Sequence, residues 1–350
     1  MASKDFDIDI SMTSFWRAWQ AFNVGKRASP DILLYKYNLT SNLLKLSNCL
    51  QDGSYKHGKY HSFTLFDPKR REISVAEVGD RVVHRLLYDY LVAIWDKSFC
   101  YDAWSCRKNK GLHGAIKRTQ QNFIKYKDGW LWRSDILKFF DSVDHTILKQ
   151  LLRTKLLQPK ALELLDEVID GCQRLLDRQT DRQTDRQTDR QTDRQTDRQT
   201  DRQTDRQTGI PIGNLTSQVF ANIYLNELDQ FVLHSIKPMG YVRYGDDFVL
   251  WCKSELLARE AQIIVTQFLT DELRLQINPL HDRIQPVRSK LAYLGVELWP
   301  SGRRLAPRVS QRIDQNLDHL NISSYHALIK HHQPIRYHRR FLYQILDILD

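Results

Sequence analysis

The sequence predicts an α+β fold in which helices pack on one face of an antiparallel sheet. Two stretches indicate strands: "WLWRSD" at residues 130–135 alternates in polarity, and "YVRYGDDFVL" at residues 241–250 has the form of a hairpin. Around them lie segments with helical apolar spacing, and a further strand pattern, "LAYLGVEL", follows. The order strand, helix, helix, hairpin, helix, strand suits an α+β domain.

Length and charge narrow the class of protein. The chain has 350 residues, 41% of them hydrophobic, which is enough to bury a core in two or three subdomains. The formal net charge is +10, and the repeat at residues 177–208 contributes none of it because Asp and Arg alternate there in equal number. A basic excess confined to the rest of the chain favours a polyanionic partner.

Cysteines and the amino terminus indicate a cytoplasmic protein. The five cysteines form no paired CxxC spacing, so neither a disulfide framework nor a zinc site is expected. The start "MASKDFDIDI" lacks a basic segment followed by an apolar one, and no apolar stretch approaches membrane-spanning length. We therefore expect no membrane partner.

The segment at residues 177–208 repeats the tetrapeptide DRQT. All of its residues are polar, and a helix would place Asp over Asp and Arg over Arg at i,i+4, so we expect a disordered surface loop. The alternative is a charged helix held by i,i+3 ion pairs.

Four segments before the repeat carry clear patterns. Residues 1–60 look like an amino-terminal helical layer, and "HSFTLFDPKRREIS" predicts a hairpin with its turn at Asp67-Pro68. "RVVHRLLYDYLVAIWD" has the spacing of a buried helix, and "HTILKQLLRTKLL" predicts a helix shortly after Asp135.

After the repeat, the stretch "GIPIGNLTSQVFANIYLNELDQFV" opens with a Gly/Pro turn and continues as a long amphipathic helix. Asn214, Thr216 and Ser217 are available to cap it.

The carboxylates carry the functional argument. Asp246 and Asp247 are adjacent like charges among apolar residues, and a third acid, Asp135, lies at a strand end. Burying them without a positive partner costs several kcal/mol. If the strands are neighbours, the three acids converge as a site for two Mg²⁺ ions, the arrangement of in-line phosphoryl transfer, with Mn²⁺ as an alternative. The structural alternative is a set of exposed strand-end and turn acids.

Taken together, "SDILKFFDSVDH", "GIPIGNLTSQVFANIYL", "YVRYGDDFVL" and "LAYLGVEL" resemble the palm motifs of reverse transcriptases. "FDPKRREIS", "DRVVHRLL", "CRKNKGLHGA" and "IGNLTSQ" resemble most closely the enzymes of diversity-generating retroelements and related bacterial reverse transcriptases. The resemblance implies a right-hand polymerase fold. We expect an N-terminal helical segment, fingers, a palm split by the repeat, and a basic helical thumb, at residues 1–60, 61–130, 131–176 with 209–300, and 301–350.

The resemblance also implies roles for individual residues. Asp135, Asp246 and Asp247 would be catalytic metal ligands, helped by the carbonyl of Ile136, and Phe140 would exclude a ribose 2′-hydroxyl. Further residues would contact the incoming dNTP or its base pair: Lys69, Arg71, Arg107, Lys108, Ile212, Gly213 and Gln218. The primer grip would consist of Tyr293, Leu294 and Gly295.

Two positions depart from the common pattern. Most reverse transcriptases have Gln where this chain has Ile212, and a branched aliphatic residue there accompanies error-prone copying in diversity-generating enzymes. We therefore hypothesise lowered fidelity. Gly245 stands where the nearest relatives usually carry Met or Ala.

The expected function is RNA-directed DNA polymerisation, in which a DNA or RNA primer is extended with dNTPs on an RNA template. An RNA-dependent RNA polymerase also carries "GDD", but such enzymes usually have Asp where this chain has Phe140. A noncatalytic RNA-binding relative is the third alternative. A basic accessory protein or a structured RNA is a further candidate partner, and diversification as a retroelement and antiviral defence both remain as biological settings.

Overall fold

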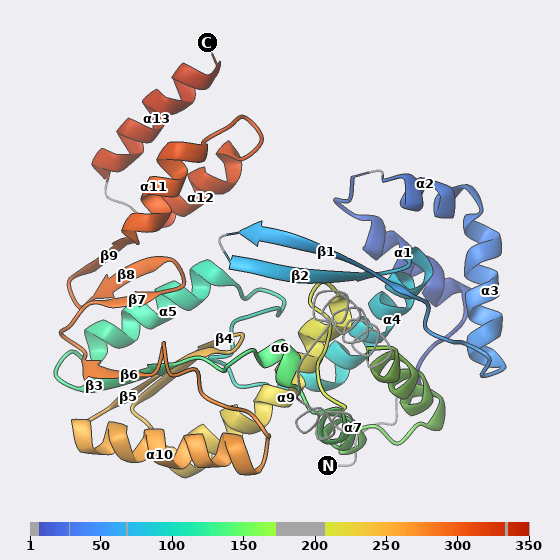
Figure 1. Cartoon of the computed structure of the whole chain (residues 1–350), viewed down its shortest axis with the longest axis horizontal. Coiled ribbons are helices and arrows are strands. Elements are labelled where there is room, and N and C mark those ends of the chain that lie inside the picture. The colour runs from blue at the N-terminus through green and yellow to red at the C-terminus, as the bar shows by residue number, and fades with distance from the viewer. Residues whose placement is uncertain (1–6, 28, 68, 173–206, 333–334, 350) are drawn as a thin grey trace, which may run out of the picture. The chain divides into compact units, whose positions relative to one another are not determined.

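The computed structural model describes residues 7–27, 29–67, 69–172, 207–332 and 335–349 (Figure 1). The chain forms two compact units. Unit 1 comprises Met1–Phe99, Leu137–Glu227 and Leu269–Leu275, and unit 2 comprises Cys100–Ile136, Leu228–Phe268 and Gln276–Asp350. The expected loop at residues 177–208 lies outside the described residues, apart from its last two positions.

Unit 1 is mostly helical and carries one long hairpin. Its elements are α1 (Met12–Asn23), α2 (Pro30–Tyr37), α3 (Leu39–Gln51), β1 (Tyr60–Asp67), β2 (Lys69–Ala76), α4 (Val78–Trp95), a 3₁₀ turn (Asp96–Ser98), α6 (Phe139–Ser142), α7 (His145–Arg153), a helix over residues 159–172 and most of α9 (Leu215–Phe231).

The strongest sequence patterns of unit 1 are present in the structure. Strands β1 and β2 pair antiparallel from Tyr60↔Ala76 to Asp67↔Lys69, as the hairpin pattern predicted. The helix predicted in "RVVHRLLYDYLVAIWD" is α4, and its buried face includes Val82, Leu86, Leu87 and Leu91. Apolar residues at these spacings make one continuous stripe on a helix, which explains why the pattern was informative.

Unit 2 contains the two other sheets and the carboxyl-terminal helices. Its elements are α5 (Leu112–Lys125), β3 (Trp130–Ser134), a π-helical turn (Val232–Ile236), β4 (Gly240–Tyr244), β5 (Asp247–Cys252), most of α10 (Glu255–Asp271), β6 (Arg283–Pro286), β7 (Leu291–Tyr293), β8 (Val296–Trp299), β9 (Gly302–Leu305), α11 (Pro307–Asn316), α12 (Ile322–His332) and α13 (Ile335–Leu349).

The central sheet has the strand order β4-β5-β3-β6, and all of its described pairings are antiparallel. This confirms the α+β class. We expected helices on one face only, but both faces are covered. On one face, Phe123 of α5 packs edge-on against Trp251 of β5. On the other, Asp282 accepts hydrogen bonds from Trp132 of β3 and from Gln262 of α10. Figure 1 shows α5 and α10 on opposite sides of this sheet.

Strand β5 explains the second layer. Five of its six residues are buried in an uninterrupted run, "FVLWC", after Asp247. A strand that faced water on one side would alternate apolar with polar residues, whereas a continuous apolar run needs cover on both sides. The layer formed by α5 supplies the second cover.

The segment "LAYLGVEL" forms two strands, so the prediction of a single strand was wrong. Strands β7 and β8 pair through Tyr293↔Val296, with Leu294 and Gly295 as a two-residue turn. Both turn residues have positive φ, 50° and 81°. A two-residue hairpin turn commonly needs this conformation, and a leucine in it is unexpected from sequence.

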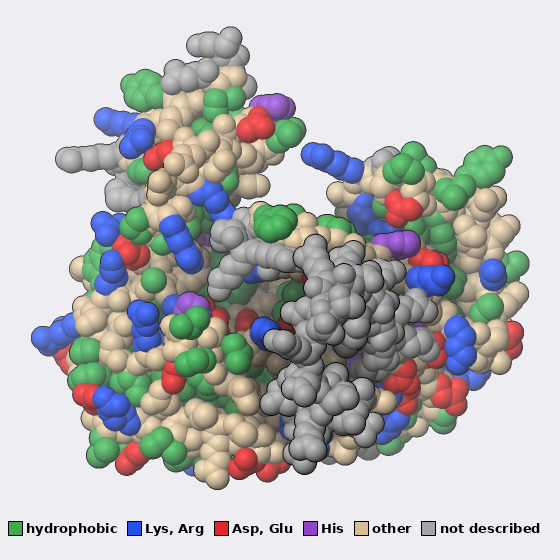
Figure 2. Space-filling view, in the orientation of Figure 1, with side chains coloured by type: hydrophobic (Ala, Val, Ile, Leu, Met, Phe, Trp, Pro, Cys, Tyr) green, Lys and Arg blue, Asp and Glu red, His purple; other side chains and the backbone are tan. Residues whose placement is uncertain are grey.

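Helices α11, α12 and α13 follow β9 at the carboxyl end. Buried apolar residues on these helices, Ile313, Ile329 and Phe341, join the core of the β7–β9 sheet. Lys and Arg side chains lie on the visible face of these helices and of the small sheet (Figure 2). A basic helical surface of this kind is suited to a nucleic-acid backbone.

Candidate functional site

The acidic residues of unit 2 lie at one end of the central sheet. Strands β4 and β5 are joined by the two-residue turn Gly245-Asp246, since Tyr244 pairs with Asp247. Gly245 has φ of 65°. Glycine adopts this left-handed conformation without a steric cost, which is why it suits the first position of a tight hairpin turn.

Strand register places Asp135 beside this turn. The pairing of β3 with β5 ends at Ser134↔Phe248, and the next residues in the same register are Asp135 and Asp247. Opposed residues in an antiparallel pair project from the same face of the sheet about 5 Å apart. The structure therefore places near one another acids that are distant in sequence.

The electrostatics of the three acids agree with this placement. Burial, and then the charges of Asp247 and Asp135, raise the pKa of Asp246 to about 6. Burial also raises the pKa of Asp247, and the charge of Asp135 adds to this, while Arg133 opposes both. Asp246 and Asp247 are thus held where their negative charge is disfavoured, and cationic charge would stabilise the pair.

Arg133 provides one such charge. Its Nε donates to Oδ1 of Asp247 at 3.1 Å, and its Nη2 donates to Oδ2 at 2.7 Å. The sequence argument predicted a positive partner for the acidic pair and assigned that role to metal ions. Arg133 was missed, although its place two residues before Asp135 on an alternating strand puts both side chains on one face.

The donor set fits hard divalent cations by its chemistry. Carboxylate oxygens are the ligands that Mg²⁺ and Mn²⁺ favour, and like charges that raise one another's pKa are relieved by a cation. Within the described residues, no three His, Cys, Asp or Glu side chains are already arranged to hold a metal ion. Asp247 is already engaged by Arg133, so a cation would be held first by Asp135 and Asp246.

A fully buried ion pair supports the turn. Arg243 of β4 donates from Nε and Nη2 to the two carboxylate oxygens of Asp229, at 2.7 and 2.6 Å. Its Nη1 donates to the carbonyl of Gly245 at 2.9 Å. The hydroxyl of Tyr241 donates to Asp229 at 2.7 Å. This network fixes the backbone that carries Asp246, and its members were not identified from sequence.

The other predicted residues of unit 2 lie near these strands. Ile136 forms an isolated bridge with Ile277. The ring of Tyr293 is buried, and its hydroxyl donates to the backbone carbonyl of Asp247 at 3.5 Å. Leu294 and Gly295 form the β7–β8 turn described above. The predicted primer-grip segment is therefore in contact with the acidic turn through Tyr293.

In unit 1, backbone bonds join the predicted gate residue to the Gly/Pro turn. The amide of Ile210 donates to the carbonyl of Phe140 at 2.7 Å, and the amide of Gly209 donates to that of Val143 at 2.8 Å. Phe140 is half-buried and lies edge-on to Phe139, with ring centroids 5.4 Å apart.

The same turn is docked on strand β2. The amide of Ser74 donates to the carbonyl of Ile212 at 2.9 Å, and the side-chain amide of Asn214 donates to the carbonyl of Ser74 at 3.0 Å. A Cβ at Gly213 would lie 2.9 Å from a methyl of Ile73, so this close approach requires glycine. Because the backbone of Ile212 is bonded to β2, its side chain is half-buried.

The helix start after this turn is held by tertiary bonds. Asn214, Thr216 and Ser217 were the residues available to cap α9. The side chain of Asn214 donates to β2 instead, and the Thr216 hydroxyl shares a 2.5 Å hydrogen bond with Nδ1 of His84. The other ring nitrogen of His84 faces His57 at 2.9 Å. Gln218, in the first turn of α9, is exposed.

The four predicted phosphate-binding cations are divided between the units. Lys69 and Arg71 belong to β2 in unit 1, where Arg71 is exposed and the side chain of Lys69 lies outside the described residues. Arg107 and Lys108 belong to unit 2, where Lys108 is exposed. Arg107 donates to the carbonyls of Cys100 and Ala103, at 2.7 and 3.2 Å, and thereby holds its own loop.

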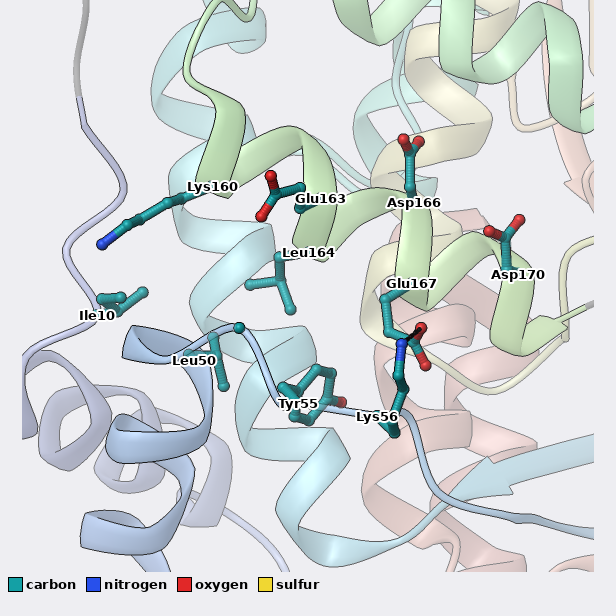
Figure 3. Close-up of a pocket in the computed structure, with 11 residues that line it drawn as sticks. Ile10, Leu50, Tyr55, Lys56, Lys160, Glu163, Leu164, Asp166, Glu167 and Asp170 are labelled. Carbon is teal, nitrogen blue, oxygen red and sulfur yellow. Dashed lines mark hydrogen bonds and ion pairs between the residues drawn. The ribbon is translucent and has the colours of Figure 1, made fainter.

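A separate acidic pocket of about 350 Å³ lies in unit 1 (Figure 3). Its carboxylates come from the helix over residues 159–172, and Asp166, Glu167 and Asp170 have cationic partners. Glu167 pairs with Lys56 at 3.3 Å, and Asp170 pairs with Lys149 at 2.6 Å. These ion pairs give the pocket a structural explanation, and we assign it no catalytic role.

Comparison with known proteins identifies the family. The model of the family described as "Reverse transcriptase (RNA-dependent DNA polymerase)" matches residues 56–298. The chain belongs to the reverse transcriptase family. The match contains the acidic turn, Asp135 and the docked Gly/Pro turn, so the residues discussed above lie in the domain that defines the family.

The curated relatives of this chain are distant. Protein YkfC of Escherichia coli is 23% identical over 66% of this chain and 63% of YkfC. The group II intron-encoded protein LtrA of Lactococcus lactis is 23% identical over 54% of this chain and 28% of LtrA. The chain thus spans less than two thirds of the length of these relatives.

Solved structures of two telomerases are similar over most of the chain. Apo telomerase of Candida tropicalis aligns with 13% identity over 72% of this chain and 55% of its own, with a TM-score of 0.48. Telomerase of Candida albicans aligns with 11% identity over 71% of this chain and 45% of its own, with a TM-score of 0.42. Among the described residues, no helix has the length and hydropathy of a membrane span.

Proposed function

We propose that this reverse transcriptase extends a DNA or RNA primer with dNTPs on an RNA template. The observation that carries the proposal is the meeting of Asp135 with Asp246 and Asp247 at one end of adjacent strands, within a chain of this family. Neither the acids alone nor the family match alone would be sufficient to propose catalysis. A bare acidic cluster can be structural, and a family member can lose its catalytic residues.

The chain's own residues would act as follows. Asp135 and Asp246 would hold divalent cations, with Asp247 and the carbonyl of Ile136 beside them. Two Mg²⁺ ions, or Mn²⁺ in their place, would activate the primer 3′-hydroxyl and offset charge on the phosphate under attack. The Tyr293–Gly295 turn would hold the primer end next to these acids, a position that its contact with Asp247 supports.

Primer extension on a primed RNA tests the proposal. Asp135→Asn and Asp246→Asn should each lower dNTP incorporation by at least about 100-fold, because each removes a charged ligand. The matched control is Asp128→Asn, since Asp128 is an exposed acid paired with Arg288 on the surface. Extension by the Asp135 variant at the control's rate would contradict the proposal.

The nucleotide used separates the two polymerase alternatives. Phe140 replaces the aspartate with which RNA polymerases select ribonucleotides, so the wild-type chain should incorporate dNTPs in preference to rNTPs. Phe140→Ala should admit rNTPs, because a large side chain that would clash with the 2′-hydroxyl is removed. Equal use of rNTPs by the wild-type protein would favour the RNA polymerase alternative.

RNA binding separates the enzyme from a noncatalytic relative. The double variant Asp246→Ala, Asp247→Ala should still bind primed RNA while it fails to extend the primer. If the wild-type protein bound primed RNA as well as the double variant does and also failed to extend the primer, a noncatalytic RNA-binding role would replace the enzymatic one.

We further propose a relationship to diversity-generating retroelements and related bacterial enzymes, with error-prone copying. Ile212 stands where a Gln amide would otherwise contact the nascent base pair. Ile212→Gln should reduce misincorporation opposite template adenines, measured by sequencing the products, and an unchanged error spectrum would refute the idea. A gene for a variable protein near a near-duplicate template would support diversification over antiviral defence. The same neighbouring genes would also show whether an accessory protein or a structured RNA is encoded beside this chain.

A further inference from the structure

Arg133 makes a paired, two-point contact with Asp247. Both carboxylate oxygens are used, by Nε at 3.1 Å and by Nη2 at 2.7 Å. The side chains are only 18% and 16% exposed. A guanidinium is planar and presents its donors as a fixed fork, so a two-point contact with a carboxylate fixes orientation as well as distance.

The remaining contacts of Arg133 extend to a third strand. Its Nη1 donates to the carbonyl of Ala292 in β7, and its guanidinium lies 5.5 Å from the ring centroid of Tyr293. The hydroxyl of Tyr293 donates in turn to the carbonyl of Asp247. Arg133 therefore connects β3, the acidic turn and the β7–β8 hairpin.

The charge balance shows what this contact does. Asp135, Asp246 and Asp247 would together carry three negative charges at one end of the sheet. Arg133 offsets one of them. Arg243 of strand β4 is fully buried and bound to Asp229; its charge still favours the ionised form of Asp246, but less than burial and the two neighbouring acids disfavour it. Asp135 and Asp246 are therefore the acids of this group that the Arg133 fork does not hold.

We infer that Arg133 is a positioning residue that serves as a built-in counter-ion. It holds Asp247 out of the metal-ligand set and leaves Asp135 and Asp246 to bind the catalytic cations. This inference rests on the proposed two-metal function and adds a division of labour among the three acids. It also gives Asp247 a role: the residue anchors the acidic turn to the strand that leads to the primer-grip segment.

Metal binding measured without nucleic acid tests the inference. Arg133→Gln frees Asp247 to join the ligands, so Mn²⁺ binding, followed by electron paramagnetic resonance, should become about tenfold tighter. In EDTA, the same variant should melt at a lower temperature than wild type, because three acids then repel one another. Added Mg²⁺ should raise its melting temperature more than that of wild type.

Adding Asp247→Asn to Arg133→Gln should cancel both effects, since the freed carboxylate is then absent. The matched control is Arg283→Gln. Arg283 pairs with Arg133 across β3 and β6 and is exposed, so its removal changes net charge equally without freeing an acid. Arg133→Lys keeps the charge and loses the fork. Arg133→Lys should therefore show a smaller tightening of Mn²⁺ binding and a smaller fall in melting temperature. It serves as the test variant if Arg133→Gln does not fold.

Unchanged Mn²⁺ affinity in the Arg133 variants, or equal tightening in Arg283→Gln, would overturn the inference. So would a failure of Asp247→Asn to reverse the tightening. None of these measurements depends on primer extension. A wild-type protein that binds Mn²⁺ and couples Arg133 to Asp247 but extends no primer would therefore refute the proposed function and leave this inference standing.

Discussion

The buried pair of Arg243 and Asp229 should be the most sensitive point of unit 2. Their side chains are 1% and 0% exposed. Burial alone would lower the pKa of Arg243, but the charge and hydrogen bonds of Asp229 outweigh it and raise the pKa. Because arginine does not lose its proton at accessible pH, Asp229→Asn would leave a full charge buried without a counter-charge.

The expected loss follows from these contacts. Breaking one partner of a buried ion pair costs about 3 to 5 kcal/mol of unfolding free energy. Asp229→Asn also sets an amide donor against the donors of Arg243 and weakens the bond from Tyr241. Over a unit of this size, such a loss corresponds to a fall of roughly 10 °C in melting temperature.

Urea unfolding of the full chain measures the loss. Tryptophan fluorescence follows the unfolding of both units, because Trp132 and Trp251 are fully buried in the sheet of unit 2 and Trp19 and Trp95 are buried in unit 1. The control is Glu255→Gln, which breaks an exposed i,i+4 pair with Arg259 and should cost no more than about 0.5 kcal/mol. The reasoning would be refuted if Asp229→Asn cost no more than this control.

A paired replacement separates charge from packing. Arg243→Met combined with Asp229→Leu removes both charges and should recover much of the stability that the single change loses. It also removes the bond from Arg243 to the carbonyl of Gly245, so primer extension should remain low even where stability returns. Equal stability of the double and single variants would show that packing, not an unpaired charge, dominates.

Three further predictions concern backbone and pH. Burial, and then the charge of His57, lowers the pKa of His84 to about 3, below its unfolded value near 6.5, so the folded state binds fewer protons. The contribution of His84 to the free energy of unfolding is thus fully present above pH 6.5, and it should fall by about 1.4 kcal/mol per pH unit below that pH. His84→Gln should flatten this pH dependence in urea titrations from pH 7 to 5. Gly213→Ala should cost about 1 to 3 kcal/mol, measured by thermal melting, because its Cβ would meet Ile73 and its φ is 118°. Gly245→Ala meets open space but has φ of 65°, so it should cost only about 1 to 2 kcal/mol and fold normally by circular dichroism; a stabilised variant would contradict the assigned turn.

Much of the fold could be predicted because the relevant patterns are local. Alternation in "WLWRSD", the helical spacing of α4 and the hairpin around Gly245 each depend on residues close in sequence. The prediction of a single strand at "LAYLGVEL" failed because Leu294 adopts a left-handed conformation that leucine rarely takes. The helix layer on the second face of the sheet was missed, because the expectation of one covered face did not take account of the uninterrupted apolar run in β5, which needs cover on both faces.

The candidate site divides in the same way. The acids were found from sequence because two adjacent carboxylates among apolar residues are unfavourable without a reason. Their partners were not found, since Arg133 and Asp247 are 114 positions apart and Arg243 and Asp229 belong to a strand and a helix. The sequence by itself determined which residues are acidic, where strands and turns form, and which apolar faces must be covered. Only the tertiary structure decided which charge neutralises which, because that choice depends on strand register and burial, and a one-residue change in register would turn every side chain to the opposite face.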